Sequence, residues 1–455
     1  MRVNTTQLFS LNLISNNMRN FTLFFAIFSF ATLFAQTPCE TGRYATDVFT
    51  NFTVTSDIVY GQNNSYSGAA TTLKMDFYEP TGDTETARPL IIWVHGGSFI
   101  GGSKTDVDVK TWSERFAKKG YACASIDYRI GFFPFDSANA VKAVVRATQD
   151  LRAALRFFYK DRATTDTYKI DTTRIYIGGS SAGAITSLHV GYLDKECEIQ
   201  DYLNASTIAS LGGLEGTSGN PGYSSTVKAV LNGCGALARY SWLEAGDIPV
   251  CSVHGTADGT VKYNRGIVNP GVALMYLDGS RMIHKRACAV GVENQFYTFP
   301  GAPHVPYAGT SAAQVAYMDT TVNFFRDFLI GQLGCTQAIL QPENSPLEAA
   351  TLYPTNYCDG SPVNEACTII GLDEVVAEDF TIFPNPTNEN ITIKFSNKAN
   401  FDVKIVDLMG RTVYTSKGIN SGSVINLNAL KTGNYFVVLT DDKANVKGTQ
   451  QLMVH

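Results

Sequence analysis

Strand-length apolar runs that alternate with helical segments restrict the fold of this chain more than any other feature. Pro89–Val94 and Tyr121–Ile126 are continuous apolar runs, as expected of strands buried on both faces of a sheet. Between them, Val107–Lys119 has the composition of a helix and ends at Gly120. Strands that alternate with helices predict an α/β fold with a doubly wound, mostly parallel sheet.

The alternation continues to residue 335. Leu73, Met75 and Phe77 alternate with polar neighbours as in a half-buried strand, and Ser137–Arg162 has the apolar spacing of an amphipathic helix. The further predicted elements are the strands Arg174–Ile177, Val227–Leu231, Ile248–Val253 and Gln295–Phe299 and the helix Ala182–Leu193. We therefore predict one α/β domain over residues 36–335.

The pattern changes after residue 335. Residues 336–375 gather polar residues and four prolines, which is typical of a linker. The short strands predicted beyond it are Thr381–Phe383, Ile391–Phe395, Val403–Asp407, Val413–Ser416, Val424–Leu427 and Tyr435–Leu439. Because no helices separate them, they predict a second domain over residues 376–455, a small all-β sandwich.

A short apolar run lies near the N-terminus, from Phe21 to Ala35. Arg19 precedes it, and Ala35 offers a small residue for cleavage before Gln36. This layout predicts a secretory signal peptide over residues 1–35. A membrane anchor is the less favoured alternative, because a spanning helix needs roughly 20 apolar residues. Met18 is an alternative start of translation.

Net charge and cysteine content indicate which partners and which cellular compartment the chain favours. The formal net charge of −5 argues against a nucleic-acid partner. Cys123 and Cys251 lie in apolar strand-like runs and are expected to be buried thiols. The cysteines in polar or loop-like sequence, where export favours disulfides of undetermined pairing, are Cys39, Cys197, Cys288, Cys335, Cys358 and Cys367. No Cys-x-x-Cys pair or histidine-rich cluster in the sequence predicts a metal site.

A nucleophile motif stands between a predicted strand and a predicted helix. Gly179-Ser180-Ser181-Ala182-Gly183 fits G-x-S-x-G with Ser181 at its centre, in the strand–turn–helix context that the motif requires. Ser181 would then project at a helix N-terminus, where a developing negative charge is favoured. The alternative is a glycine-rich turn with a solvated serine.

A serine nucleophile needs a base and a carboxylate that orients the base. Asp258 and His304 each follow a predicted strand, and the order Ser, Asp, His is the one used with this motif. We therefore predict Ser181, Asp258 and His304 as a catalytic triad. The alternative candidates are His284 for the base and Asp247 and Asp278 for the acid.

The loop His95-Gly96-Gly97-Ser98-Phe99 follows the strand Pro89–Val94. Consecutive glycines let backbone N–H groups face a ligand, so we predict an oxyanion hole from Gly97 or Ser98 together with Ala182. The alternative is a tight loop braced by His95.

Substrate contacts are less determined by the sequence. We predict Phe99, Phe133, Trp242 and Tyr307 as substrate-binding residues. The cluster Phe132, Phe133 and Phe135 fits an acyl or aromatic pocket and a place in the core equally well.

The chain from Leu73 to Phe328 resembles the secreted carboxylesterase and lipase branch of the α/β-hydrolases. The matching pieces are Met75-Asp76-Phe77-Tyr78-Glu79-Pro80, His95–Phe99, Asp127-Tyr128-Arg129, the Ser181 turn and the Asp258 and His304 loops. Ser98 stands where many relatives carry a third glycine. The resemblance implies a serine esterase that works through an acyl-enzyme and needs no cofactor, and Asp127, Tyr128 and Arg129 are interpreted as scaffold.

The stretch from Phe380 to His455 resembles the type A sorting domain of type IX secretion. The pieces that carry this resemblance, in the family's order, are Phe383-Pro384-Asn385-Pro386, Val406-Asp407-Leu408-Met409-Gly410-Arg411 and Leu430-Lys431-Thr432-Gly433-Asn434-Tyr435. It implies passage through the periplasm and outer membrane to the cell surface or the medium, with the type IX machinery as partner. An additional substrate-binding sandwich is the alternative.

These features together predict a monomeric, secreted hydrolase of carboxylic esters outside the cell: polysaccharide-linked esters, polyesters or lipids. Two other functions stay open at this point. One is a secreted serine peptidase, since the same triad cleaves amides. The other is a non-catalytic binding module at the cell surface.

Overall fold

The computed structural model describes residues 39, 41–345, 352–357, 359–363, 380–395, 400–407, 411–440 and 446–455. The predicted signal peptide, Cys358 and Cys367 lie outside these residues.

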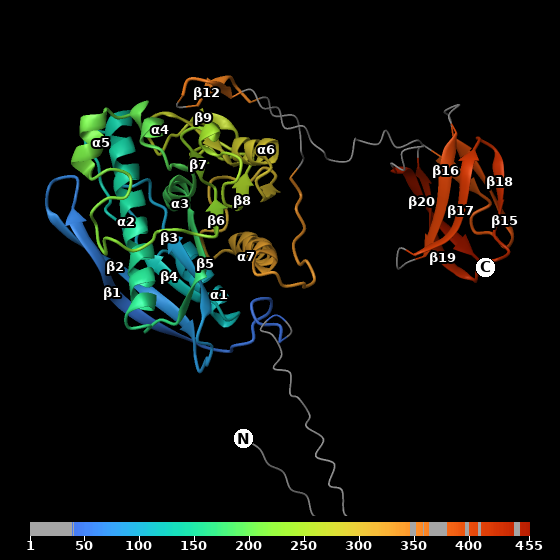
Figure 1. The fold of residues 1–455 in the computed structure, drawn as a ribbon, viewed down its shortest axis with the longest axis horizontal. Coiled ribbons are helices and arrows are strands. Elements are labelled where there is room, and N and C mark those ends of the chain that lie inside the picture. Colours follow the sequence, from blue (N-terminus) through green and yellow to red (C-terminus); the bar gives the residue numbers. More distant parts are fainter. Residues whose placement is uncertain are drawn as a thin grey trace, which may run out of the picture.

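The α/β domain is built on one sheet of eight strands in the order β1-β2-β4-β3-β5-β6-β8-β11 (Figure 1). The strands are β1 (Phe52–Asn64), β2 (Ala70–Pro80), β3 (Arg88–Val94), β4 (Ala122–Ile126), β5 (Ile170–Ser180), β6 (Ala229–Gly233), β8 (Val250–Gly255) and β11 (Asn294–Phe299). β2 pairs antiparallel with β1 and β4, whereas the pairs from β4 through β3, β5, β6 and β8 to β11 are parallel. The predicted mostly parallel sheet is confirmed.

Helices cover both faces of this sheet. They are α1 (Val107–Lys118), α2 (Ser137–Ala163), α3 (Ala182–Tyr192), α4 (Glu196–Gln200), α5 (Ala205–Leu211), α6 (Ser280–Val290) and α7 (Ala312–Gln332). Successive side chains of β3 point to opposite faces, and each face belongs to its own apolar core. Ile91 and Trp93 share a core with α1 and α7, whereas Ile92 and Val94 share one with α2 and α3.

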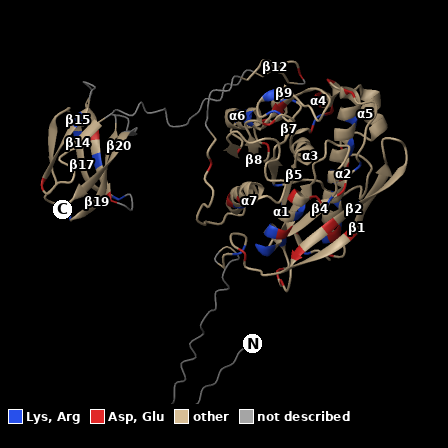
Figure 2. Cartoon of the chain, turned by 180° about the vertical axis from the view of Figure 1, so that it is seen from behind, with Lys and Arg blue, Asp and Glu red and all other residues tan. Residues whose placement is uncertain are grey.

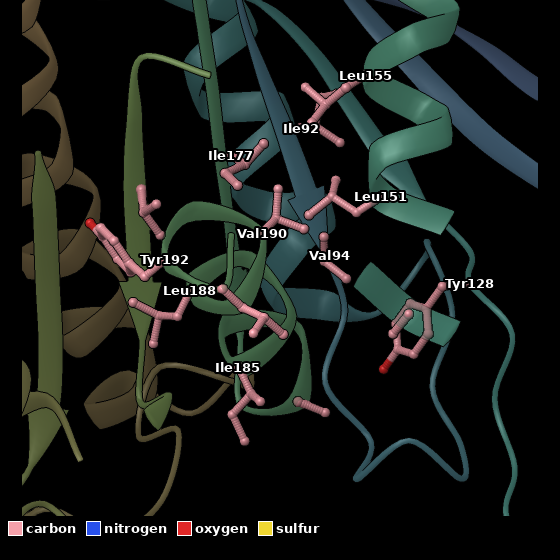
Figure 3. Close-up of a cluster of buried hydrophobic side chains, with 14 of the residues drawn as sticks. Ile92, Val94, Tyr128, Leu151, Leu155, Ile177, Ile185, Leu188, Val190 and Tyr192 are labelled. Atoms are coloured by element: carbon pink, nitrogen blue, oxygen red, sulfur yellow. The ribbon is translucent and has the colours of Figure 1, made fainter. Parts of the chain in front are cut away.

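The core beneath α2 and α3 holds the two helices against the carboxyl ends of the central strands. The side chains that meet there include Ile92, Val94, Ile177, Leu151, Leu155, Ile185 and Leu188 (Figure 3). All seven are nearly or fully inaccessible to solvent. Burial of one such side chain stabilises the fold by about 1.5 to 3 kcal/mol.

Local sequence explains where the long helices begin. Asp136 precedes α2 and accepts a hydrogen bond from the backbone N–H of Asn139. Ser311 and Gln314 form a capping box at the start of α7, each side chain bonded to the other residue's backbone N–H.

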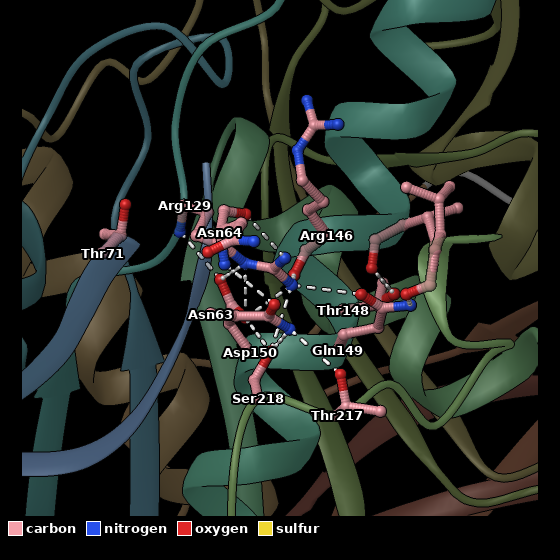
Figure 4. Close-up of polar contacts among 12 residues, drawn as sticks. Asn63, Asn64, Thr71, Arg129, Arg146, Thr148, Gln149, Asp150, Thr217 and Ser218 are labelled. Atoms are coloured by element: carbon pink, nitrogen blue, oxygen red, sulfur yellow. Dashed lines mark hydrogen bonds and ion pairs between the residues drawn. The ribbon is translucent and has the colours of Figure 1, made fainter. Parts of the chain in front are cut away.

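A buried polar cluster ties β1, α2 and the segment before β6 together (Figure 4). Arg129 forms an ion pair of 2.8 Å with Asp150 and also donates to Gln149 and Ser218. Ser218 donates in turn to Asp150 at 2.6 Å. These contacts agree with the interpretation of Arg129 as scaffold.

Smaller elements complete this part of the chain. They are β7 (Ala236–Leu237), η1 (Tyr240–Trp242), β9 (Arg265–Ile267), β10 (Tyr276–Gly279), β12 (Thr355–Asn356) and β13 (Pro362–Val363). β7, β10 and β9 form a three-stranded sheet, and β12 pairs with β13.

The C-terminal domain consists of two antiparallel sheets, β14-β15-β18 and β17-β16-β19-β20. Its strands are β14 (Phe380–Phe383), β15 (Asn390–Phe395), β16 (Phe401–Asp407), β17 (Thr412–Ile419), β18 (Ser423–Asn426), β19 (Gly433–Thr440) and β20 (Val446–Val454). Ile393, Val403 and Leu439 belong to one core that both sheets share. The predicted all-β sandwich is confirmed.

The cysteines follow the predicted division. Cys39 and Cys335 form a disulfide that joins the N-terminal segment to the end of α7. Cys197 and Cys288 are also disulfide-bonded, and Cys123 and Cys251 are free and buried as predicted. Cys234, for which the sequence supported no assignment, is a third buried free thiol.

Parts of the segment predicted as a linker are hydrogen-bonded to the α/β domain. Glu343 and Asn344 accept hydrogen bonds from the backbone N–H groups of Phe296 and Thr298, on the outer side of β11. Tyr353 donates to Asp278 at 2.6 Å. Proline and polar content suggested a spacer, but backbone groups at the exposed edge of β11 need partners, and residues of this segment supply them.

Acidic and basic residues are interspersed over the α/β domain on the side seen in Figure 2. Among the residues that the structure describes, no helix has the length and apolar character needed to cross a bilayer.

Candidate active site

Ser181 stands at the turn between β5 and α3, at the carboxyl edge of the sheet. Its backbone adopts φ 54° and ψ −116°, a conformation that non-glycine residues rarely take and that a nucleophile elbow requires. A hydrogen bond of 2.8 Å from its N–H to the carbonyl of Gly233 holds the turn. Glycine is needed at both flanks: a Cβ on Gly179 or on Gly183 would lie 2.5 Å or 1.9 Å from the carbonyl oxygen of Val94.

The structure brings the three residues of the predicted triad into one hydrogen-bonded chain. His304 Nε2 lies 2.7 Å from Ser181 Oγ, and His304 Nδ1 lies 2.6 Å from Asp258 Oδ2. Asp258 follows β8 and His304 follows β11, so two neighbouring parallel strands deliver them to the same edge. Ser181 and Asp258 are buried, and His304 is partly exposed.

Asp258 is held as a carboxylate. Burial would raise the pKa of Asp258, but hydrogen bonds from His254 and His304 outweigh burial and hold this pKa well below its usual value. His254 is fully buried, and its Nε2 lies 3.1 Å from Asp258 Oδ2 and 2.9 Å from the carbonyl of Val261. Since a carbonyl only accepts, His254 Nε2 carries a proton and donates.

Cys234, His254 and Asp258 offer potential metal-ligand atoms within 4.8 Å of one another. Their chemistry fits hydrogen bonding better than coordination of a cation. Burial raises the pKa of Cys234 to about 12, so it stays a neutral thiol. His254 Nε2 is committed to Val261, and its Nδ1 lies 2.7 Å from Ser280 Oγ.

The loop after β3 lies beside Ser181 as predicted. A Cβ on Gly96 would lie 3.3 Å from that of Ser181. Gly97, at φ 103°, has no room for a side chain, and Ser98 and Phe99 also have positive φ. In the described part of the chain, the N–H groups of Gly97 and Ser98 donate no hydrogen bond. His95 braces the loop through Nδ1, 2.7 Å from the carbonyl of Gly96.

The rival residues make no contact with Ser181 or His304. His284 lies on α6, and burial lowers its pKa to about 4. Asp278 contacts Arg265 at 2.9 Å, and Asp247 accepts from the backbone N–H of Glu244 at 2.7 Å. None of these three is bonded to Ser181 or His304.

Two cavities meet at Ser181. The first runs beneath α2 and along α3 and is lined mostly by apolar side chains, Phe99, Phe132 and Trp242 among them. The second is an open groove, where Asn269 is exposed to solvent and Asp106 and His304 are partly exposed. Ser98 and Ser181 line both.

The structure places two of the predicted substrate contacts outside the lining of both cavities. Phe133 is 70% exposed and does not line the cavity, whereas its neighbour Phe132 does. Tyr307 is 0% exposed and packs on Trp112 behind the turn, where its hydroxyl lies 3.2 Å from Ser180 Oγ. Phe99 and Trp242 line the cavity, and their contact with the substrate stays a prediction.

Sequence reasoning overlooked His189 and His254. His254 stands four residues before Asp258 in His254-Gly255-Thr256-Ala257-Asp258, close enough in sequence to suggest a contact. His189 stands eight residues after Ser181, on the helix that the motif opens. Helical periodicity could have placed it along the same cavity.

Comparisons with known proteins agree with this architecture. Residues 75–236 match the family described as BD-FAE, and residues 381–455 match the family described as Secretion system C-terminal sorting domain. Gut esterase 1 of Caenorhabditis briggsae is 30% identical over 176 residues, which are 38% of this chain and 30% of that protein. Gut esterase 1 of Caenorhabditis elegans is 28% identical over 149 residues, 32% of this chain and 25% of that protein.

The chain thus spans less than a third of the length of these curated relatives. Among solved structures, the apo form of Thermogutta terrifontis esterase 2 has 19% sequence identity and a TM-score of 0.47, and the match covers 62% of this chain and 96% of that one.

The strand order, the Ser181 turn and the two family matches lead to one classification. The fold is that of an α/β-hydrolase, residues 75–236 match an esterase family of that fold, and the C-terminal sorting domain of type IX secretion directs the chain to the cell surface or beyond.

Proposed function

We propose that this hydrolase is a serine carboxylesterase that acts on an extracellular ester through an acyl-enzyme. The observation that carries the proposal is the unbroken chain of hydrogen bonds from Ser181 Oγ through His304 to Asp258. Such a chain activates a hydroxyl that is a poor nucleophile by itself.

Ser181 Oγ attacks the ester carbonyl while its proton passes to His304 Nε2. Asp258 stabilises the imidazolium that forms. The carbonyl oxygen becomes an oxyanion, which the N–H groups of Gly97 or Ser98 and Ala182 stabilise by hydrogen bonds. His304 then returns the proton to the departing alkoxide, and an acyl ester of Ser181 remains.

A water molecule repeats the sequence in the second half-reaction. His304 takes its proton as the water oxygen attacks the acyl carbon, and the proton goes back to Ser181 Oγ as the acid leaves. These steps use side chains and backbone of the protein alone.

The two cavities at Ser181 hold different parts of the ester. The apolar cavity receives the acyl group, because its walls favour a hydrocarbon over water. The open groove receives the alcohol, because it admits solvent and a large polar or polymeric group. A polysaccharide-linked ester, a polyester or a lipid fits this division.

Labelling with a fluorophosphonate tests the proposal directly. The purified protein should take up one label on the peptide that contains Ser181, and Ser181→Ala should remove both the label and ester hydrolysis. We expect kcat to fall by about 10⁵-fold or more. Ser187→Ala is the matched control, since Ser187 is a buried serine of the same helix whose hydroxyl donates to Gly183.

Persistent labelling or hydrolysis in Ser181→Ala would exclude this nucleophile. An ester panel run beside peptide amides separates esterase from peptidase. Faster cleavage of the amides would favour the peptidase alternative, and no label on the wild type would favour the binding module.

A further inference from the structure

His189 lies deep in the apolar cavity, on the same helix as the nucleophile turn. It follows Ser181 by eight residues, and Ile185 stands halfway between them on the same side of α3. At about 1.5 Å per residue, the two Cα atoms are about 12 Å apart along the helix axis. The cavity therefore extends from Ser181 to His189.

The protonation of His189 follows from its hydrogen bond. Its Nδ1 lies 2.7 Å from the carbonyl oxygen of Ile185, which only accepts, so Nδ1 carries the proton. Burial lowers the pKa of His189 to about 4, so the ring is neutral at neutral pH. Nε2 is then left with a lone pair and can only accept a hydrogen bond.

No residue of the described chain donates to that lone pair. The ring is 4% exposed, and Trp242 packs against it at 5.5 Å between centroids with the planes at 85°. Tyr202 also lines this end, but its hydroxyl is directed to the carbonyl of Ala238 at 3.4 Å. An acceptor at the wall of an apolar cavity that has no protein donor is poorly compensated, and a ligand with a suitable donor would supply the missing hydrogen bond.

We propose that His189 determines acyl specificity by accepting a hydrogen bond from a hydroxyl at the far end of the acyl group. The inference rests on the proposed esterase function and names the substrate class: esters of acids with an apolar chain that ends in a hydroxyl. The apolar wall along α3 holds the chain, and Nε2 of His189 selects its end.

A pair of esters of equal size tests the proposal. Ethyl hydroxyoctanoate, with its hydroxyl on the terminal carbon, is compared with ethyl nonanoate, in which a methyl group replaces that hydroxyl. We expect kcat/KM of the wild type to favour the hydroxy ester by about tenfold. His189→Leu should lower this ratio to one or less, because the acceptor is gone.

Two further variants sharpen the test. His189→Gln keeps an amide oxygen that accepts a hydrogen bond and should retain part of the preference. His284→Leu makes the same change at a histidine of α6 outside the cavity and should leave the ratio unchanged. A wild-type ratio of one, or an unchanged ratio in His189→Leu, would overturn the proposal.

A short acetyl ester, which cannot reach His189, separates this proposal from the proposed function. Hydrolysis of the acetyl ester together with a wild-type ratio of one rejects the role of His189 and leaves the esterase function intact. Failure to hydrolyse any of the esters rejects both. If His189→Leu does not fold, the wild-type ratio of kcat/KM for the two esters still tests the proposal.

Discussion

Four hydrogen bonds determine which oxygen of Asp258 meets which donor. Oδ1 accepts from the backbone N–H groups of Thr260 and Val261, at 2.8 and 2.9 Å. Oδ2 accepts from His304 and His254. Because both ends of the carboxylate are engaged, His304 must keep its proton on Nδ1 and present the lone pair of Nε2 to the serine.

Asp258→Asn should therefore impose the wrong tautomer on His304. The two backbone N–H groups retain the amide oxygen at the Oδ1 position, so the NH₂ group faces His304 Nδ1. The imidazole can accept this bond only by moving its proton to Nε2, where it no longer serves as a base. We expect kcat for a small soluble ester to fall by about 10³- to 10⁴-fold, with the fold intact by circular dichroism.

Asp278→Asn is the matched control for that variant. Asp278 is equally buried, but it is bonded to Arg265, Tyr353 and the backbone of Tyr240, away from Ser181. The change should lower the melting temperature and leave kcat near the wild-type value. The reverse pattern, with activity lost in Asp278→Asn and kept in Asp258→Asn, would contradict the assignment of the acid.

The residues that could be predicted are those tied to a motif. The Ser181 pattern, and Asp258 and His304 placed after strands, needed only neighbouring sequence and chain order. The cavity wall combines side chains from distant segments, such as Phe132 and Trp242, and no local pattern reports that meeting. For the same reason, sequence alone could not show that Phe133 is exposed and that Tyr307 is buried.

At the scale of secondary-structure elements, the close contact between α3 and β3 positions Ser181. α3 approaches β3 so nearly that a Cβ on Gly183 would lie 1.9 Å from the carbonyl oxygen of Val94 and 2.4 Å from its carbon. Both obstacles are backbone atoms in the centre of the sheet, so they cannot rotate away. The N–H of Ala182 and the loop His95–Phe99, which form the proposed oxyanion hole, therefore keep their separation only while residue 183 is glycine.

Gly183→Ala should move α3 outward and displace Ser181. Overpacking of this kind costs about 1 to 3 kcal/mol of unfolding free energy, and a displacement near 1 Å lowers kcat by about 10²-fold. Thermal melting and ester kinetics measure the two effects. Gly101→Ala serves as control, because a Cβ there meets no atom within 4 Å, and wild-type behaviour of Gly183→Ala would refute the contact.

Fully buried strands were easier to predict from the sequence than exposed ones. β3 and β4 are buried along their whole length and stand out as apolar runs. β1 is largely exposed and pairs at the edge of the sheet, so its sequence, FTVTSDIVYGQNN, has no comparable run and went unpredicted. α7 also lacked a prediction, although the Ser311–Gln314 capping box marks its start.

At the scale of the whole molecule, the α/β unit extends past the predicted boundary at residue 335. Val363 shares a small apolar cluster with Tyr240 and Met282. Arg286 donates to Tyr357 at 2.7 Å, and Asn344 is bonded to β11. We propose residue 363 rather than 335 as the better end of a catalytic fragment, since the shorter one exposes these partners.

The C-terminal domain has its own apolar core, which includes Phe380, Ile393 and Leu452. Deletion of residues 380–455 should therefore leave the catalytic core intact and remove the sorting signal. In the native host we expect active enzyme in the periplasmic fraction and little in the medium, with ester hydrolysis measured in both. Full-length Ser181→Ala is the control, because it should reach the medium without activity and so separate export from catalysis. Normal secretion of the truncated protein would refute the sorting role. If that protein also bound an insoluble polymer more weakly than the full-length chain, the domain would act instead as an additional substrate-binding sandwich.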